Sequence, residues 1–472
     1  MSQRKKYLAK NTALFALNSI GTRIITFFFV PLYTNVFTTS EYGTVDIITT
    51  ISTILVPVIT INIGEAVMRF ALDDDANRDD VMSVGLLYAA LSVFLGFSSF
   101  LVVNFFSQIS VNSWLVYFYC VIHGLYLVFS CNLRGQEKLF HYAAGNILQT
   151  LVAAIFNIIF LLVLKIGIDG YFYAYIFSYA VSFLYCAIVG NVRETIRRFH
   201  INLELMRKMV TYSIVLVPNS LMWWIMNSSD HVMVTSMLGV AANGIYAVSY
   251  KIPSILSSLS TVFNQAWSYS VIHESKSKDI VAFNNNMFDK LVKFQLIMTV
   301  SLMCVIKPFM KIYVQPSYYE AWVYTPYLLI GYFFLTMGTF LSTIYTAYKD
   351  SKGFLFSGST GAILNILLNW LLIPICGVHG AALATCFSYF VVFLYRAWDT
   401  RKYIAVRVFK LEYILGYLLL ILTACSMAIP YWWGWIVLLV EFVAIVIINR
   451  KFILECILTV RRILSKAKKG NS

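Results

Sequence analysis

The sequence predicts an all-α polytopic membrane protein with about fourteen transmembrane helices. Of its 472 residues, 60% are hydrophobic and only 12% are charged, whereas a soluble domain carries about a quarter charged residues. Apolar runs of roughly 20 residues, the length that crosses a bilayer core, recur along the whole chain. The polar breaks between these runs are short, so we expect one continuous membrane domain with no sizeable extramembrane part.

The spans are placed by the length and helical periodicity of each apolar run. They cover residues 11–37, 44–68, 82–105, 113–132, 143–164, 170–190, 209–237, 240–270, 290–313, 321–347, 355–375, 379–398, 411–429 and 432–449.

Positive charge fixes the orientation of these spans. With the N-terminus inside, most of the 36 Lys and Arg residues fall on the cytoplasmic side, as the positive-inside rule requires. The net charge of +14 therefore comes mainly from the cytoplasmic loops and does not indicate nucleic-acid binding. The eight cysteines are scattered without metal-type spacing and are interpreted as packing residues. The cytoplasmic groups include Arg193, Arg197, Arg198, Arg207, Lys208, Arg396, Arg401, Lys402, Arg407 and Lys410.

An internal repeat divides the chain. Residues 170–185 and 380–395 share glycine, phenylalanine, serine and tyrosine at one constant offset, and the alternative is chance similarity between aromatic segments. Six spans separate the copies, which predicts two six-helix lobes related by a pseudo-twofold axis along the membrane normal. The predicted parts are an N-terminal lobe (1–208), a C-terminal lobe (209–402), two further helices (403–449) and a basic amphipathic cytoplasmic tail (450–472) on the inner leaflet.

Four ionisable residues lie at membrane depth on the first two spans of each lobe: Arg23, Asp46, Asp230 and Lys251. Such groups are costly in a bilayer and should face a cavity or a partner. If the lobes are related as predicted, Arg23 and Lys251 converge on a central cavity and suit a phosphate or pyrophosphate. The alternative is that they form structural ion pairs with Asp46 and Asp230.

Other polar residues in the spans have competing interpretations. Glu65 and Arg69, four residues apart, can pair along one helix face, or Arg69 can anchor the inner end of its span. His123 and Glu441 are interpreted as helix contacts rather than proton relays. The sequence lacks a nucleotide-binding loop, a metal-type cluster and a hydrolase motif. We therefore expect a transporter with no catalytic residue, metal or cofactor, not an enzyme.

Short motifs recur along nearly the whole chain. They are Leu8-Ala9-Lys10-Asn11-Thr12, Pro31-Leu32-Tyr33, Ser40-Glu41-Tyr42-Gly43, Val67-Met68-Arg69-Phe70, Asn227-Ser228-Ser229-Asp230, Gly244-Ile245-Tyr246 and Gly377-x-x-Gly380-Ala381-Ala382. Together these motifs resemble those of the Wzx-type polysaccharide flippases of the multidrug/oligosaccharidyl-lipid/polysaccharide (MOP) exporter superfamily.

The resemblance implies a bacterial inner-membrane flippase that moves undecaprenyl-pyrophosphate-linked oligosaccharide by alternating access, for O-antigen, capsule or exopolysaccharide synthesis. It makes Arg23, Lys251 and Arg69 candidates for phosphate binding. Coupling to H⁺ or Na⁺ would use Asp230, Asp46 or Glu65. The expected partners are this lipid-linked substrate and the bilayer, with polysaccharide synthesis enzymes as a further candidate, but no nucleic acid.

Two alternatives stay open at this point. A cation-coupled multidrug exporter of the same superfamily would need acidic cavity groups, and both signs of charge are present. A membrane polysaccharide polymerase or ligase would usually carry a large outer loop, which the predicted topology lacks.

Overall fold

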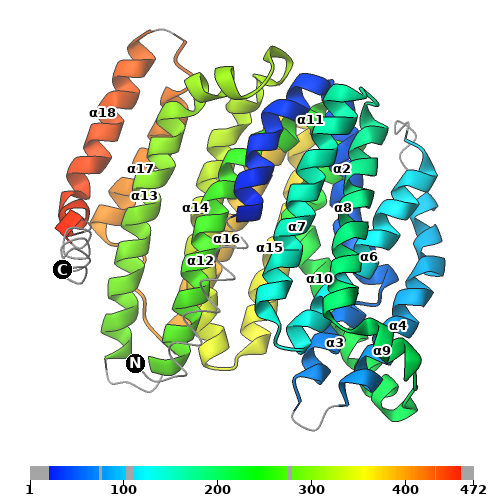
Figure 1. Ribbon diagram of the computed structural model, residues 1–472. Helices are drawn as coiled ribbons and strands as arrows, with labels where there is room; N and C mark the ends of the chain where they lie inside the picture. Colours follow the sequence, from blue (N-terminus) through cyan, green and yellow to red (C-terminus); the bar gives the residue numbers. More distant parts are fainter. Residues whose placement is uncertain are drawn as a thin grey trace, which may run out of the picture. The chain divides into compact units, whose positions relative to one another are not determined.

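The structure is a computed structural model that describes residues 21–73, 77–101, 111–274, 279–430, 432–455 and 457–458. The start of the first predicted span and most of the basic tail lie outside these residues. The described chain is helical and contains no strand (Figure 1). Ten of its helices are long and apolar enough to cross a bilayer, and α17 (Leu411–Ser426) and α18 (Trp432–Ile448) are shorter apolar helices. The protein is thus a multi-pass membrane protein.

The chain forms two compact units. The first contains the described residues up to Val248 together with Val314–Tyr318, and the second contains the rest. The elements of the first unit begin with a helix at residues 21–36 and continue with α2 (Thr39–Ile59), α3 (Ile63–Ala71), α4 (Arg78–Leu95), η1 (Gly96–Ser98), α6 (Ser113–Gly135), α7 (Leu139–Asn157), η2 (Ile158–Val163), α8 (Ile168–Val189), α9 (Val192–Arg197), α10 (Leu203–Leu238), α11 (Val240–Ser249) and η3 (Pro316–Tyr318).

Helix α6 is the centre of the first unit, where it packs against α2, α3, α4, α7 and α8. Small residues permit the close approach: a Cβ on Gly124 would lie 2.9 Å from the Thr60 side chain, and one on Gly135 would lie 2.7 Å from Ala71. Helix α10 packs on α2, α3 and α4 in the same unit. This places the polar residues of α2, α10 and α11 within one body.

The second unit is built around α14 (Ala321–Ala347), the most buried of the long apolar helices. It packs against α12 (Lys251–Glu274), α13 (Ile280–Tyr313), α15 (Ser351–Cys376) and α16 (Val378–Asp399). Helices α17 and α18 follow η4 (Thr400–Lys402), pack on each other, and both contact α13. The two C-terminal helices are therefore attached to the second unit through α13.

Every predicted span is helical in its described residues, but two of them are broken. The span predicted at 44–68 is α2 and α3, separated at residues 60–62, where Ile61 and Asn62 have φ of 51° and 53°. Pro57 precedes the break and removes a backbone donor from the helix. The span predicted at 240–270 is likewise α11 and α12, with the break at Tyr250 immediately before Lys251.

Backbone geometry supports the internal repeat. Gly167 precedes α8 with φ 76° and ψ −144°, and Gly377 precedes α16 with φ 59° and ψ −139°. They lie at the same offset as Gly170 and Gly380, and only glycine adopts this backbone region readily. Each unit therefore contains a helical hairpin, α7–α8 or α15–α16, closed by an equivalent glycine turn.

One charge assignment is wrong. Arg396, which the sequence places among the cytoplasmic loop charges, is 3% exposed near the end of α16. Its Nε donates to Ser357 Oγ at 3.0 Å and its Nη1 donates to the Gly338 carbonyl at 3.0 Å. Arg396 thus joins α16 to α14 and α15 inside the second unit, and a hydropathy reading cannot detect this because it averages over neighbouring residues.

Candidate functional site: an acid–histidine cluster

Two predicted coupling residues, Asp46 and Asp230, lie in one buried polar cluster of the first unit. We call Asp46, Asp230, His231, Asn243 and Tyr246 the acid–histidine cluster. Asp46 lies about two turns from the start of α2, Asp230 and His231 lie about two turns from the end of α10, and the other two belong to α11. The three helices meet at these ends because α10 turns directly into α11 at Gly239, whose φ is 94°.

His231 is the centre of the cluster. Its Nδ1 lies 2.7 Å from Asp46 Oδ2 and 3.1 Å from Asn243 Oδ1. Both neighbours are oxygens that accept, so Nδ1 must carry the proton. The Asn243 amide nitrogen also donates to Asp46 Oδ2 at 3.1 Å and to the Gly43 carbonyl at 3.3 Å. The Asp46 carboxylate therefore accepts hydrogen bonds from α10 and α11 at once.

Asp230 has separate donors in the same cluster. The Tyr246 hydroxyl donates to Asp230 Oδ2 at 2.7 Å, and the His231 backbone N–H donates to Oδ1 at 3.0 Å. Asp230 is 2% exposed and Tyr246 is fully buried. A carboxylate in this environment needs such donors, because an ionised group without them would be strongly destabilised.

Two glycines bring the backbones of α2 and α11 together beside the cluster. A Cβ built on Gly43 would lie 1.9 Å from the Val240 carbonyl oxygen, and one on Gly244 would lie 2.0 Å from the Thr39 carbonyl oxygen. In the sequence, Tyr42-Gly43 follows the first predicted span and Asn243-Gly244 follows the seventh, so the two glycines occupy similar places in the two halves of the repeat. The crossing is thus symmetric in sequence, and only glycine fits at its two contact points.

The cluster can hold and exchange a proton. Histidine is the side chain whose ordinary pKa lies nearest neutrality, and here it bridges one carboxylate through its side chain and contacts another through its backbone. A change of charge on His231 or Asp46 would alter the hydrogen bonds that join α2, α10 and α11. A titratable group is therefore linked to the contact between these helices.

Glu65 and Arg69, which could have paired with each other along α3, bind other partners. Arg69 Nη1 pairs with Asp73 Oδ1 at 2.5 Å, one turn further along the chain, and both side chains are about half exposed. Glu65 instead lies 3.6 Å from Arg134 of α6. The predicted pairing of Glu65 with Arg69 is therefore replaced by two separate ion pairs, one from the first turn of α3 and one from its last turn.

The structure places Arg23 and Lys251 in different units. Arg23 is an exposed residue of the helix at 21–36, and Lys251 is the partly exposed first residue of α12. Their convergence on one cavity stays a prediction.

His123 and Glu441 both make helix contacts, in line with the interpretation from sequence. The His123 ring stacks on Tyr179 with 4.4 Å between centroids. Glu441 Oε1 accepts from the Ser426 hydroxyl at 2.7 Å, which links α18 to α17.

Sequence reasoning missed His231, Asn243 and Tyr246 as site residues. Their signal was present: His231 directly follows Asp230 in an apolar helix, and Asn243 is a lone amide at the start of the next one. A polar residue on each of several apolar runs, at one predicted depth, is the pattern that would have identified the cluster.

The sequence also matches a protein-family model. The model described as polysaccharide biosynthesis protein matches residues 8–276, more than half of the chain. The chain belongs to this family. A comparison with curated protein sequences gives no significant match.

Solved structures agree with the family at the level of the fold. One match is "Lipid II flippase MurJ, inward closed conformation", with a TM-score of 0.68 and 15% identity over 93% of this chain and 100% of that chain. An inward-facing multidrug resistance MATE family transporter of the MOP superfamily gives a TM-score of 0.62 and 12% identity over 87% of this chain and 98% of that chain. The Vibrio cholerae MATE transporter VcmN in its bent form gives a TM-score of 0.51 and 12% identity over 89% of this chain and 99% of that chain.

The chain thus combines the polysaccharide biosynthesis family with the fold of MOP superfamily transporters. The family match confirms the predicted family resemblance, and the fold is that of solved MOP superfamily transporters.

Proposed function

We propose that this protein is a flippase that carries undecaprenyl-pyrophosphate-linked oligosaccharide from the cytoplasmic to the outer leaflet of a bacterial inner membrane. The observation that carries the proposal is the family match to polysaccharide biosynthesis proteins on a chain with the fold of lipid-flipping and ion-coupled exporters. Polysaccharide synthesis needs a lipid-linked intermediate to cross the bilayer, and a polytopic protein with this fold is suited to that step.

In this proposal the fourteen spans form two six-helix lobes that rock against each other. Arg23 and Lys251 hold the pyrophosphate, Arg by forked hydrogen bonding and Lys as a compact charge. Arg69, near the inner end of the first lobe, is a third candidate contact for the incoming phosphate. The N- and C-termini are cytoplasmic, as the positive-inside distribution favours.

Proton coupling is proposed for the acid–histidine cluster. Asp46 accepts from His231 and Asn243, and Asp230 accepts from Tyr246. The imidazole at the centre of the cluster favours H⁺ over Na⁺ as the coupling ion. Its Nδ1–H points at the Asp46 carboxylate oxygen, which a sodium ion would need as a ligand. Glu65 is a weaker candidate because Arg134 already neutralises it in part.

The phosphate-binding role is tested by removing its charges. Arg23→Ala, Lys251→Ala and the double variant would be expressed in a deletion strain, with Lys311→Ala as a control for an exposed cation elsewhere. We expect loss of surface polysaccharide for the first three at normal membrane levels of the protein. Export at the wild-type level by the double variant would refute the role of these residues.

A second candidate is a cation-coupled multidrug exporter, favoured by the likeness to MATE structures over 87% of this chain. Drug-susceptibility profiling of the deletion strain separates the two functions. A strain that becomes sensitive to cationic drugs while its surface polysaccharide is unchanged would support the exporter.

A further inference from the structure

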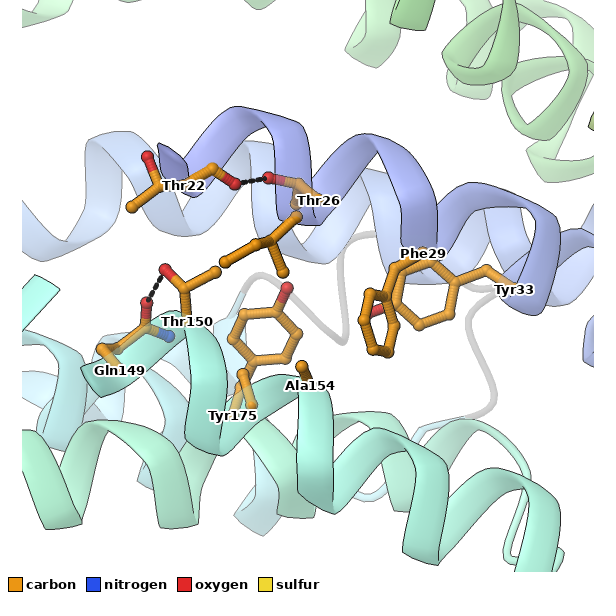
Figure 2. A pocket seen from close by; sticks show the side chains of 10 residues that line it. Thr22, Thr26, Phe29, Tyr33, Gln149, Thr150, Ala154 and Tyr175 are labelled. Carbon is orange, nitrogen blue, oxygen red and sulfur yellow. Dashed lines mark hydrogen bonds between the residues drawn. The ribbon is translucent and has the colours of Figure 1, made fainter. Parts of the chain in front are cut away.

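The first unit contains a cavity that the proposed phosphate and coupling sites do not use. It has a volume of about 200 Å³ and lies between the helix at residues 21–36, α7 and α8 (Figure 2). Its polar lining consists of Thr22, Thr26, Tyr33, Gln149, Thr150 and Tyr175. Figure 2 shows the threonines of the first helix facing Gln149 and Thr150 of α7, with the Tyr175 hydroxyl pointing toward the first helix.

Helical spacing explains why these side chains converge. Thr22, Thr26, Phe29 and Tyr33 recur every three or four residues, so they share one face of their helix. On α7, Gln149 and Ala153 are four residues apart, as are Thr150 and Ala154, so these side chains also share one face. The cavity is possible because α7 presents small alanines at positions 153 and 154, where larger side chains would fill the space.

The polar lining is rich in acceptors and carries no charge. The Thr26 hydroxyl donates to the Thr22 carbonyl at 2.5 Å, and the Thr150 hydroxyl donates to the Asn146 carbonyl at 3.0 Å. The Gln149 amide nitrogen donates to Ser178 at 3.1 Å. The lining therefore offers hydroxyl and amide groups that can both donate and accept. A phosphate does not match it, because no cation lines the cavity to balance the negative charge.

A sugar ring does match it. Its hydroxyls can both donate to and accept from the hydroxyl and amide groups of the lining, and its apolar face can pack on Phe29, Tyr33 or Tyr175. The volume is below the roughly 300 Å³ at which typical ligand pockets begin, so it admits one ring rather than a chain. A lipid acyl chain would match only the apolar part of the lining and would make no hydrogen bond to its six polar side chains.

We propose that this cavity is a sugar-binding subsite that holds one ring of the lipid-linked oligosaccharide. The inference rests on the proposed flippase function. It is supported by the position of Arg23, which directly follows Thr22 in the same helical turn. A phosphate at Arg23 and a sugar in the cavity would then be held by adjacent residues of one helix.

The test compares two probes on purified protein in detergent. One is radiolabelled undecaprenyl pyrophosphate carrying the oligosaccharide of the host strain, and the other is undecaprenyl pyrophosphate alone. Tyr175→Phe removes one hydroxyl from the cavity, and Ala154→Phe fills it. The matched controls are Tyr173→Phe on α8 and Ile155→Phe on α7, both exposed neighbours outside the lining.

We expect Tyr175→Phe to weaken binding of the sugar-bearing probe by about three- to tenfold, the effect of one hydrogen bond. Ala154→Phe should weaken it by more than tenfold. Neither should change binding of the sugar-free lipid, and the controls should bind both probes as wild type does.

Wild-type affinity of both cavity variants for the sugar-bearing probe would overturn the subsite but leave the flippase proposal intact. An equal loss for both probes would also overturn it, because the cavity would then serve the lipid or the fold. If wild-type protein bound neither probe, the proposed function itself would fail.

Discussion

The Nδ1 of His231 lies 2.7 Å from a carboxylate oxygen of Asp46, 185 positions away in the sequence. This contact joins α10 to α2 within a membrane-spanning unit. Both side chains are nearly buried, at 10% and 13% exposure. A proton that moves onto or off this pair changes the attraction between the two helices, and the first prediction follows from this.

Asp46→Asn should abolish the dependence of transport on a proton gradient, because asparagine keeps the shape of the side chain but does not titrate. We expect translocation by the variant in proteoliposomes to run at the same rate with and without an inward proton gradient. Asp73→Asn, at an exposed ion pair on the same unit, is the control and should respond to the gradient like wild type. A gradient response retained by Asp46→Asn would remove the cluster from coupling.

The crossing of α2 and α11 should not tolerate a side chain at either glycine. Gly43→Ala and Gly244→Ala each place a methyl group about 2 Å from a carbonyl oxygen of the other helix, so the backbones must separate. We expect each variant to lower the thermal unfolding midpoint in detergent by several degrees. Gly358→Ala, where a Cβ would have nothing within 4 Å, is the control.

The control should raise the midpoint slightly, because alanine favours a helix over glycine by about 1 kcal/mol. The crossing would be looser than described if all three alanine variants had the same midpoint.

Arg396 is predicted to act through its volume more than through its charge. Its hydrogen-bond acceptors, the Gly338 carbonyl and the Ser357 hydroxyl, sit on helices α14 and α15, and Ser357 also donates to Phe354. Arg396→Ala should therefore destabilise the fold by about 2–5 kcal/mol, as a core cavity does. Arg396→Met, which nearly conserves volume, should stay within about 1 kcal/mol of wild type.

Thermal or denaturant unfolding in detergent measures both Arg396 variants, with exposed Arg401→Ala as a neutral control. If Met destabilised the protein as much as Ala does, the guanidinium hydrogen bonds would be the main contribution.

The connection between α14 and α15 should weaken in acid. The Gly353 backbone N–H, Lys402 and Tyr403 all donate to the Asp350 carboxylate and hold its pKa below the ordinary value of 3.8. A lowered pKa stabilises the folded state above the unfolded-state value and stops doing so as the pH falls through the folded-state value. The gap in unfolding midpoint between wild type and Asp350→Asn should thus be present at pH 6 and shrink as the pH falls below 3.8. A gap that does not change with pH would mean that the charge of Asp350 is irrelevant.

The sequence predicted most of the helices. Hydrophobic length located the ten helices that are long and apolar enough to cross a bilayer and the two shorter ones, α17 and α18, because a bilayer demands about 20 apolar residues in a helix. The constant offset that links Gly170 to Gly380 also links Gly167 to Gly377, which share an unusual backbone conformation.

Tertiary contacts decided what the sequence did not. The breaks at residues 60–62 and at Tyr250 lie inside two predicted spans, because the span placement weighed apolar length and not the nearby Pro57 and Pro253. Arg396 looked like a loop charge because only its packing against Gly338 and Ser357 shows that it is buried. The role of His231 likewise depends on a helix 185 positions away. Pairings of this kind are set by the packing of whole helices rather than by local pattern.

The central claim is tested most directly by reconstituting the purified protein in liposomes with undecaprenyl-pyrophosphate-linked oligosaccharide. The quantity to measure is the rate at which the sugar becomes accessible to an enzyme added outside. We expect the wild type to accelerate translocation well above protein-free liposomes, and Arg23→Ala combined with Lys251→Ala to lose at least about tenfold of that rate, the effect of one charge-assisted hydrogen bond. A wild-type rate equal to that of protein-free liposomes would contradict the account.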